Sequence, residues 1–238
     1  MKSKLAIWLT LTLSACGGGG SGGTALAPGP AAVNFGAAFA SLINNGLSVN
    51  VSLSGSVQGN AISGTGTYAL APSVSAPFDN GAAALSQALS ATFNVTAGGQ
   101  TITVTSSVTD YYQTGSYAFL GEQDNNPPPP LEFDIALPPL TYPSMVKFGD
   151  TAVLGTVMRY QDNTKSSAAG TATVSYLVKA GAANSDTLIV ELINQIYDVN
   201  NMLVQTDKTD YAVTASGAIS FVSATAQEGA DSLVVTAN

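Results

Sequence analysis

The side chains that could perform chemistry are few, and their types exclude most kinds of active site. The 238 residues include no histidine and a single cysteine, Cys16. Without histidine, a serine nucleophile lacks the general base of the usual catalytic triad, and a serine–lysine dyad would need a buried lysine. Zinc, copper and haem sites require His or Cys ligands, which the chain after Cys16 does not contain. We therefore expect no metal, no cofactor and no enzymatic activity.

Carboxylates are the remaining candidates for acid–base chemistry. Hydrolysis of a glycosidic bond requires only two of them, so the inventory of residues leaves this reaction open. The glutamates after the N-terminal region lie far apart, and no pair stands out: Glu122, Glu132, Glu191 and Glu228. Stretches rich in Asp and Asn could hold calcium, but none has the spacing of a dedicated calcium loop, and we interpret them as turns.

Cys16 lies at the end of a short apolar N-terminus. Lys2 and Lys4 precede the apolar run Leu5–Leu13, which spans about 14 Å as a helix and is too short to cross a bilayer. This pattern predicts a signal peptide. Leu13-Ser14-Ala15-Cys16 resembles the lipobox of bacterial lipoprotein precursors. The resemblance implies that Cys16 carries a diacylglycerol and a further acyl chain such as palmitate, and that residues 1–15 are removed.

The sequence after Cys16 fits a lipid anchor. Residues 16–32 are rich in Gly, Ala and Pro and have no periodicity, which predicts a flexible tether between the membrane and the folded domain. Gly17 follows the cysteine where an Asp would retain a lipoprotein in the inner membrane, so the resemblance implies a cell envelope location at the outer membrane.

The charge of the chain limits its partners. Fifteen acidic residues outnumber seven basic ones, and the net charge is −8. Two of the basic residues lie in the predicted signal peptide. Such a chain disfavours nucleic acid and anionic head groups, so we expect contact with the membrane through the N-terminal lipid only. A protein, glycan or lipid partner stays unidentified.

One helix and many strands are predicted. Apolar residues at helical spacing over 34–46, with Asn34 as a start and Gly46 as a stop, indicate a helix that packs on a sheet. From Leu47 the period becomes two, and Gly98-Gly99 predicts a tight hairpin. Residues 188–196 fit either a helical face or a strand, and their β-branched side chains favour a strand.

These elements predict a mainly β fold, an antiparallel meander in the form of a curved sheet, sandwich or half-barrel, with one short N-terminal helix. Residues 33–238 form the β-rich domain. Two lobes, 33–120 and 145–238, joined by a Pro-rich connector over 121–144, would fit weak similarities between the two halves. A membrane-spanning barrel is disfavoured, because Ser and Thr alternate with Val and Leu and aromatic girdles are absent.

Two hypotheses for function follow. The first is a non-catalytic, lipid-anchored envelope protein whose β-rich domain binds a partner or has a structural role, similar in style to β-rich lipoproteins of proteobacteria. The alternative is a periplasmic carrier or chaperone for lipid or another apolar ligand. A deep apolar cavity would favour the carrier, and a cleft with two convergent carboxylates would favour an enzyme.

Overall fold

The computed structural model describes residues 29–126, 132–182 and 185–238. The lipobox with Cys16 and most of the predicted tether lie outside these residues. The described chain contains one helix and thirteen strands, in the order α1 (Phe35–Asn45), β1 (Leu47–Val57), β2 (Asn60–Leu70), β3 (Val74–Phe78), β4 (Ala82–Ala97), β5 (Gln100–Gln113), β6 (Phe119–Asp124), β7 (Phe133–Leu140), β8 (Thr151–Tyr160), β9 (Ala168–Ala180), β10 (Thr187–Tyr197), β11 (Leu203–Thr214), β12 (Ile219–Glu228) and β13 (Asp231–Ala237).

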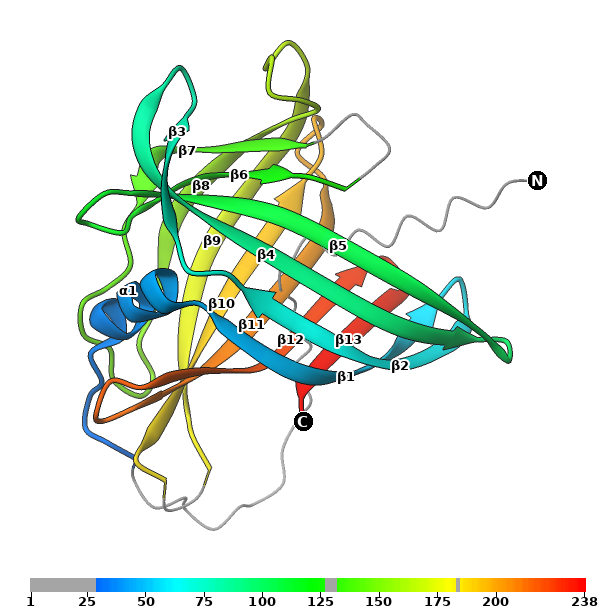
Figure 1. Cartoon of the computed structure of the whole chain (residues 1–238), viewed down its shortest axis with the longest axis horizontal. Coiled ribbons are helices and arrows are strands. Elements are labelled where there is room, and N and C mark those ends of the chain that lie inside the picture. Colours follow the sequence, from blue (N-terminus) through cyan, green and yellow to red (C-terminus); the bar gives the residue numbers. More distant parts are fainter. Residues whose placement is uncertain (1–28, 127–131, 183–184) are drawn as a thin grey trace.

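The strands form one antiparallel sheet that closes into a barrel (Figure 1). Each strand from β4 to β13 pairs with the next along the chain, β13 returns to β1, and β2 pairs with β4 to complete a wall of twelve strands. The prediction of a mainly β, antiparallel fold with one short helix is confirmed. The barrel is the closed form of the predicted curved sheet, and closure satisfies the backbone groups that an edge strand would leave unpaired.

The segment from residue 121 to 144 supplies part of the barrel wall. β6 and β7 lie within or beside this Pro-rich stretch and pair with each other and with β5 and β8. Residues 127–131, which contain the four consecutive prolines, lie outside the described residues. The described residues on both sides of the stretch therefore belong to one barrel.

Helix α1 closes one end of the barrel. The Asn34 side chain accepts a hydrogen bond from the Ala37 backbone N–H, and the chain leaves the helix at Gly46 with φ 68°. Both ends agree with the prediction. One apolar face of α1 is buried against the barrel interior: Phe35, Ala38, Phe39, Leu42 and Ile43. The helix thus acts as a plug whose apolar face completes the core (Figure 1).

A buried glutamine joins the plug to the wall. The Gln87 side chain is 1% exposed, and its Nε2 lies 3.1 Å from the carbonyl oxygens of Leu42 and Ile43 and 2.9 Å from that of Ala71. The last carbonyls of a helix have no partner within the helix, and leaving them unpaired in an apolar interior costs free energy. Gln87 therefore holds the C-terminal end of α1 in place.

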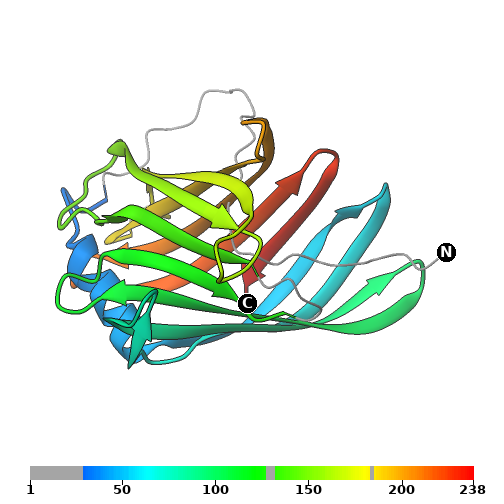
Figure 2. The same ribbon diagram turned by 90° about the horizontal axis from the view of Figure 1, so that it is seen from above.

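The wall separates an apolar interior from a hydroxyl-rich exterior. On β1, Val51 and Leu53 are buried while Ser52 and Ser54 are exposed. The same alternation runs along β2, β4 and β5, whose outward residues are mostly Ser, Thr and Asn. Figure 2 shows the strands on both sides of this interior, with α1 at one end. Within the described residues, no helix combines the length and the apolar character needed to span a bilayer.

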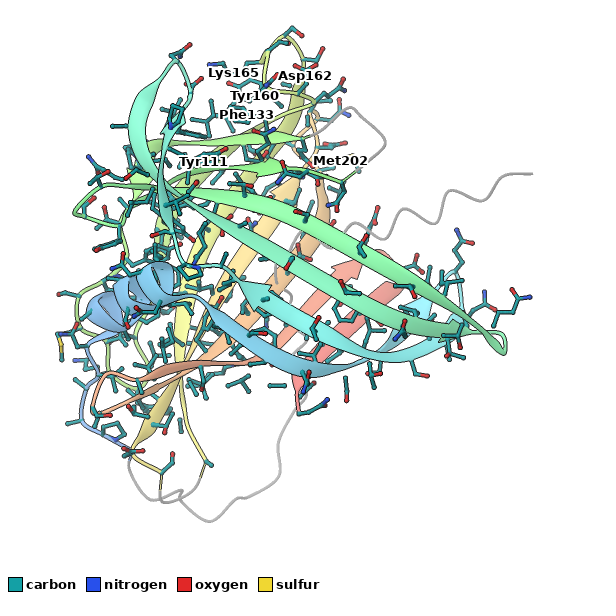
Figure 3. All side chains as sticks on the ribbon, viewed as in Figure 1. Tyr111, Phe133, Tyr160, Asp162, Lys165 and Met202 are labelled. Atoms are coloured by element: carbon teal, nitrogen blue, oxygen red, sulfur yellow. The ribbon has the colours of Figure 1, made fainter. Side chains whose placement is uncertain are left out.

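A second, smaller apolar cluster lies on the outer face under β3. The Phe78 ring is 4.6 Å from that of Tyr111 and 5.5 Å from that of Phe133, measured between centroids. Figure 3 shows Tyr111, Phe133 and Tyr160 on the side of the barrel that carries β3. The Lys165 ammonium lies 2.5 Å from the Asp79 carboxylate and ties the β8–β9 loop to the end of β3. This cluster fixes β3 to the outside of the barrel.

Candidate functional site

Aromatic rings form the layer of the interior next to α1. The Phe39 ring lies 4.3 Å from Tyr142, 6.3 Å from Tyr112 and 6.2 Å from Tyr211, measured between centroids. Tyr68 joins the layer through a stacked contact with Phe221 at 4.7 Å. Burial raises the pKa of Tyr68, Tyr112, Tyr142 and Tyr211 above that of a free phenol. The rings are therefore neutral phenols at physiological pH.

A row of charged residues crosses four neighbouring strands below these rings. The register pairs Asp110 on β5 with Glu122 on β6, Glu122 with Asp134 on β7, and Asp134 with Arg159 on β8. Directly paired residues on adjacent strands lie side by side on one face of the sheet. All four line the same interior cavity. The sheet thus brings three carboxyl groups and one guanidinium together inside the barrel.

Of the three carboxyl groups in this row, only that of Asp134 forms an ion pair with Arg159. Its guanidinium forms an ion pair with Glu132 and lies 3.4 Å, from Nε, from Oδ2 of Asp134. Asp110 instead accepts a hydrogen bond from the Tyr112 hydroxyl at 3.1 Å. Among the described residues, no Lys or Arg lies within ion-pair distance of Asp110 or Glu122. These two carboxyl groups are the part of the row without a cationic partner.

Burial determines the protonation of the row. It raises the pKa of Asp110 to about 6, although hydrogen bonds from Tyr112 and Glu122 oppose the shift. Burial also raises the pKa of Glu122, and the neighbouring charges of Asp110 and Asp134 add to the effect. The pKa of Asp134 rises to about 8, mainly by burial and against the charge of Arg159. Burial thus favours the protonated form of all three carboxyl groups, and it raises the pKa of Asp134 further than that of Asp110.

Two more carboxyl groups are buried outside the cavity lining. Asp207 on β11 is fully buried, and both of its oxygens accept from Nε2 of Gln205, at 2.9 and 2.7 Å. Burial raises the pKa of Asp207 to about 10. Asp124 is 2% exposed and accepts from the Asn126 backbone N–H at 2.7 Å. Both are held by local hydrogen bonds and do not line the cavity.

The cavity between the rings and the charged row has a volume of about 130 Å³. A cavity of about 150 Å³ can hold a benzene-sized molecule, whereas pockets for larger ligands span about 300–1,000 Å³. The aliphatic and phenylalanine part of the lining comes from α1, β2 and β4 to β10. Two oxygens in the lining, Oδ1 of Asp134 and Oδ1 of Asn194, are buried and have no hydrogen-bond partner. The space therefore suits a small molecule with a polar group.

The structure brings together carboxyl groups that the sequence did not pair. Glu132 forms an ion pair with Arg159, and Glu122 is paired with Asp134 in the charged row. Glu191 instead lies on the outer face, with its Oε2 2.7 Å from Nζ of Lys179. Glu228 is exposed at the β12–β13 turn. A signal for Asp110 was present, because it has the same parity as the inward residues Val108 and Tyr112 of its strand.

Two of the three Asx-rich stretches form turns, as interpreted from the sequence. The interpretation is wrong for the third, because Asp207 and Asp210 lie within strand β11 and pair with β10. Oδ1 of Asp198 accepts from the backbone N–H groups of Asn200, at 2.9 Å, and Met202, at 2.8 Å. Asp124 and Asn126 form a similar turn. In the part of the chain that the structure describes, no group of three or more His, Cys, Asp or Glu side chains has the arrangement of a metal site.

Ser144 and Lys147 have the Ser-x-x-Lys spacing of a serine–lysine dyad. Both side chains are exposed in the segment before β8, and the Lys147 backbone N–H donates to Asp150. A lysine acts as a base when burial lowers its pKa. Lys147 is exposed and lacks the burial that such a dyad requires.

Comparison of the chain with protein-family models, with curated proteins and with solved structures gives no match.

Proposed function

We propose that this chain is a non-catalytic, lipid-anchored binding protein of a bacterial envelope, which takes a small ligand into its barrel. Cys16 in the lipobox-like Leu13-Ser14-Ala15-Cys16 supplies the anchor, and residues 16–32 supply the tether. Outer-membrane attachment follows from the same resemblance. The cavity of about 130 Å³ between aromatic rings and buried carboxyl groups is the observation that carries the binding function.

The small size of the cavity favours the binding of a small ligand over glycoside hydrolysis and over transport of a lipid. Convergent carboxyl groups are what a glycosidase needs, but a sugar chain also requires an open cleft of several hundred Å³. An acyl chain of a membrane lipid likewise exceeds about 130 Å³. The apolar face of α1 at the barrel end is the one feature that favours a lipid carrier, which would require α1 to move. Acyl chains found in mass spectra of the native protein would support that alternative.

The binding function is tested by filling the cavity. Ala172 lines the cavity and is 1% exposed, whereas Thr171 lies on the opposite face of β9. A ligand that binds only the folded protein raises its melting temperature. In a screen of small metabolites, we expect compounds that stabilise the native protein and the Thr171→Leu control but not Ala172→Leu. Equal stabilisation of all three proteins would place the ligand outside the barrel and contradict the proposal.

The anchor is tested separately. Replacement of Cys16 by Ser removes the thiol that would be acylated, and two or three acyl chains give a stable attachment to a bilayer. We expect the native protein in the membrane fraction and Cys16→Ser in the soluble fraction. The intact mass of the native protein should show a chain that starts at residue 16 and carries fatty acyl groups. An unmodified thiol would overturn this part of the proposal.

A further inference from the structure

We infer that the cavity selects a small organic cation, an ammonium ion with a short apolar part, whose charge lies beside Asp110. This inference rests on the proposed binding function and names its ligand class. It starts from the two halves of the lining, which are aromatic rings on the side of α1 and a row of carboxyl groups below them.

Asp110 belongs to the charged row and also contacts the aromatic layer. Its Oδ2 accepts from the Tyr112 hydroxyl at 3.1 Å, and its charge acts on Tyr68, Tyr142 and Tyr211 as well. The carboxylate therefore shares the lining of the cavity with four phenol rings. Rings attract cations at their faces, and aromatic cages that bind quaternary ammonium groups use this attraction.

One carboxylate of the row, that of Asp110, is available to pair with a bound cation. Arg159 forms ion pairs with Glu132 and Asp134, whereas the ionised Asp110 has a hydrogen bond but no Lys or Arg partner among the described residues. A buried charge without a partner costs free energy, which a bound cation would recover. An anionic ligand would meet Asp110 at close range, and a neutral ligand would leave its charge unpaired.

Two further oxygens point to a donor group in the ligand. Oδ1 of Asp134 and Oδ1 of Asn194 are buried in the lining without a hydrogen-bond partner. Buried acceptors of this kind are rare, because each one loses its interaction with water. A primary ammonium ion has three donors, and a hydroxyl on the apolar part of a quaternary ammonium ion has one. The volume of about 130 Å³ limits such a ligand to roughly the size of benzene.

The test compares cations with neutral molecules of the same shape. Choline is matched by 3,3-dimethylbutan-1-ol, in which carbon replaces the nitrogen, and n-butylammonium is matched by butan-1-ol, in which a hydroxyl replaces the ammonium group. Affinity for the full-length native protein is measured by calorimetry at pH 8. We expect at least one cation to bind about tenfold more tightly than its neutral match, the size of one buried cation–π contact. Asp110→Asn should remove this preference, while Asp186→Asn, at an exposed position, should keep it.

The pH profile gives a second readout that a purely structural role would not produce. The groups that face Asp110 are Glu122, Asp134 and Arg159 in the row and the phenols of Tyr68, Tyr112, Tyr142 and Tyr211. Protonation of Asp110 removes the charge that binds the cation, so the preference should fall as the pH decreases through about 6. The neutral match should show no such change.

The outcomes distinguish this inference from the proposed function. If a neutral compound binds as tightly as its cation and Ala172→Leu abolishes both, the barrel is a binding site but the inferred ligand class is wrong. If neither cation is preferred, or if Asp110→Asn keeps the preference, the inference is overturned. The membrane-release test of Cys16→Ser is independent of all these results.

Discussion

At the scale of single residues, the interior carboxyl groups are balanced by protons more than by cations. Burial raises the pKa of five of them, and Arg159 is the cation that forms ion pairs in the charged row: Asp110, Glu122, Glu132, Asp134 and Asp207. Taking an ionised carboxylate out of water without a partner is costly, so burial raises the pKa instead. The barrel interior therefore stores protons that the unfolded chain would release.

This proton storage predicts an unusual dependence of stability on pH. A carboxyl group with a raised pKa in the folded state stabilises that state most below its unfolded pKa of about 4 and loses the contribution as the pH rises through the folded pKa. For Asp207, that window extends from about 4 to about 10. We expect the free energy of unfolding to fall between pH 5 and pH 9, as measured by denaturant titration at each pH.

Asp207→Asn identifies one source of this dependence. Asn has the shape of the protonated Asp and no charge to bury, so the variant should be more stable than the native protein at pH 8 and similar at pH 4. One group contributes at most about 1.4 kcal/mol per pH unit. Asp162 lies in the β8–β9 loop and its pKa is lowered by hydrogen bonds from Thr164, so Asp162→Asn should not flatten the profile. An unchanged pH slope in Asp207→Asn would show that Asp207 is ionised in the folded protein.

At the scale of elements, the junction of α1 with β1 depends on the lack of a side chain at Gly46. A Cβ atom there would lie 2.3 Å from the Leu70 carbonyl oxygen and 2.8 Å from the carbonyl carbon of Ala71. Gly59, in the β1–β2 turn, has a similar φ of 75°, but a Cβ atom there would meet nothing within 4 Å. The two positions share the left-handed backbone and differ in the space around it.

Substitutions at Gly46 and Gly59 distinguish the free-energy cost of backbone strain from that of a steric clash. Gly59→Ala should cost about 1 kcal/mol, the penalty of a left-handed conformation with a Cβ atom. Gly46→Ala should cost several kcal/mol, since strand β2 or helix α1 must also shift. Urea unfolding of both variants measures the difference. Equal losses would mean that the α1 plug adapts to the added methyl group without effect on the barrel.

The elements were more predictable than the site they build. Helix α1 was predicted together with both of its caps, because apolar spacing and capping chemistry are local in sequence. The register across β5, β6, β7 and β8 is not local. Irregularities at Tyr111/Tyr112 and Phe119/Gly121 shift it, and a shift of one residue moves every side chain to the opposite face. Asp110, Glu122, Asp134 and Arg159 therefore become neighbours only through the complete sheet.

At the scale of the whole molecule, the pairing of β2 with β4 closes the meander into a barrel that encloses the cavity. The register pairs Gly64 with Val95 and Gly66 with Phe93 along this seam. A Cβ atom on Gly66 would lie 2.1 Å from the Thr92 carbonyl oxygen, and one on Gly64 would lie 2.3 Å from that of Asn94. Glycine within a strand commonly marks a close backbone approach or a bend at a barrel corner. These two glycines let the ends of the sheet meet.

Gly66→Val should therefore open the barrel more than it disturbs any single strand. The added side chain clashes with the backbone of β4, so hydrogen exchange should accelerate at the amides that pair β2 with β4, while those between β10 and β11 keep their protection. Loss of the container should also abolish any ligand-induced rise in melting temperature, because the cavity lining includes Tyr68 and Leu70 of β2 and Leu89 of β4. Thr67→Val, on the exposed face of β2, is the matched control and should leave both readouts unchanged. If exchange instead accelerates uniformly over all strands, the β2–β4 pairing opens only when the whole barrel unfolds. This result would contradict the prediction that the pairing at Gly64 and Gly66 can open separately.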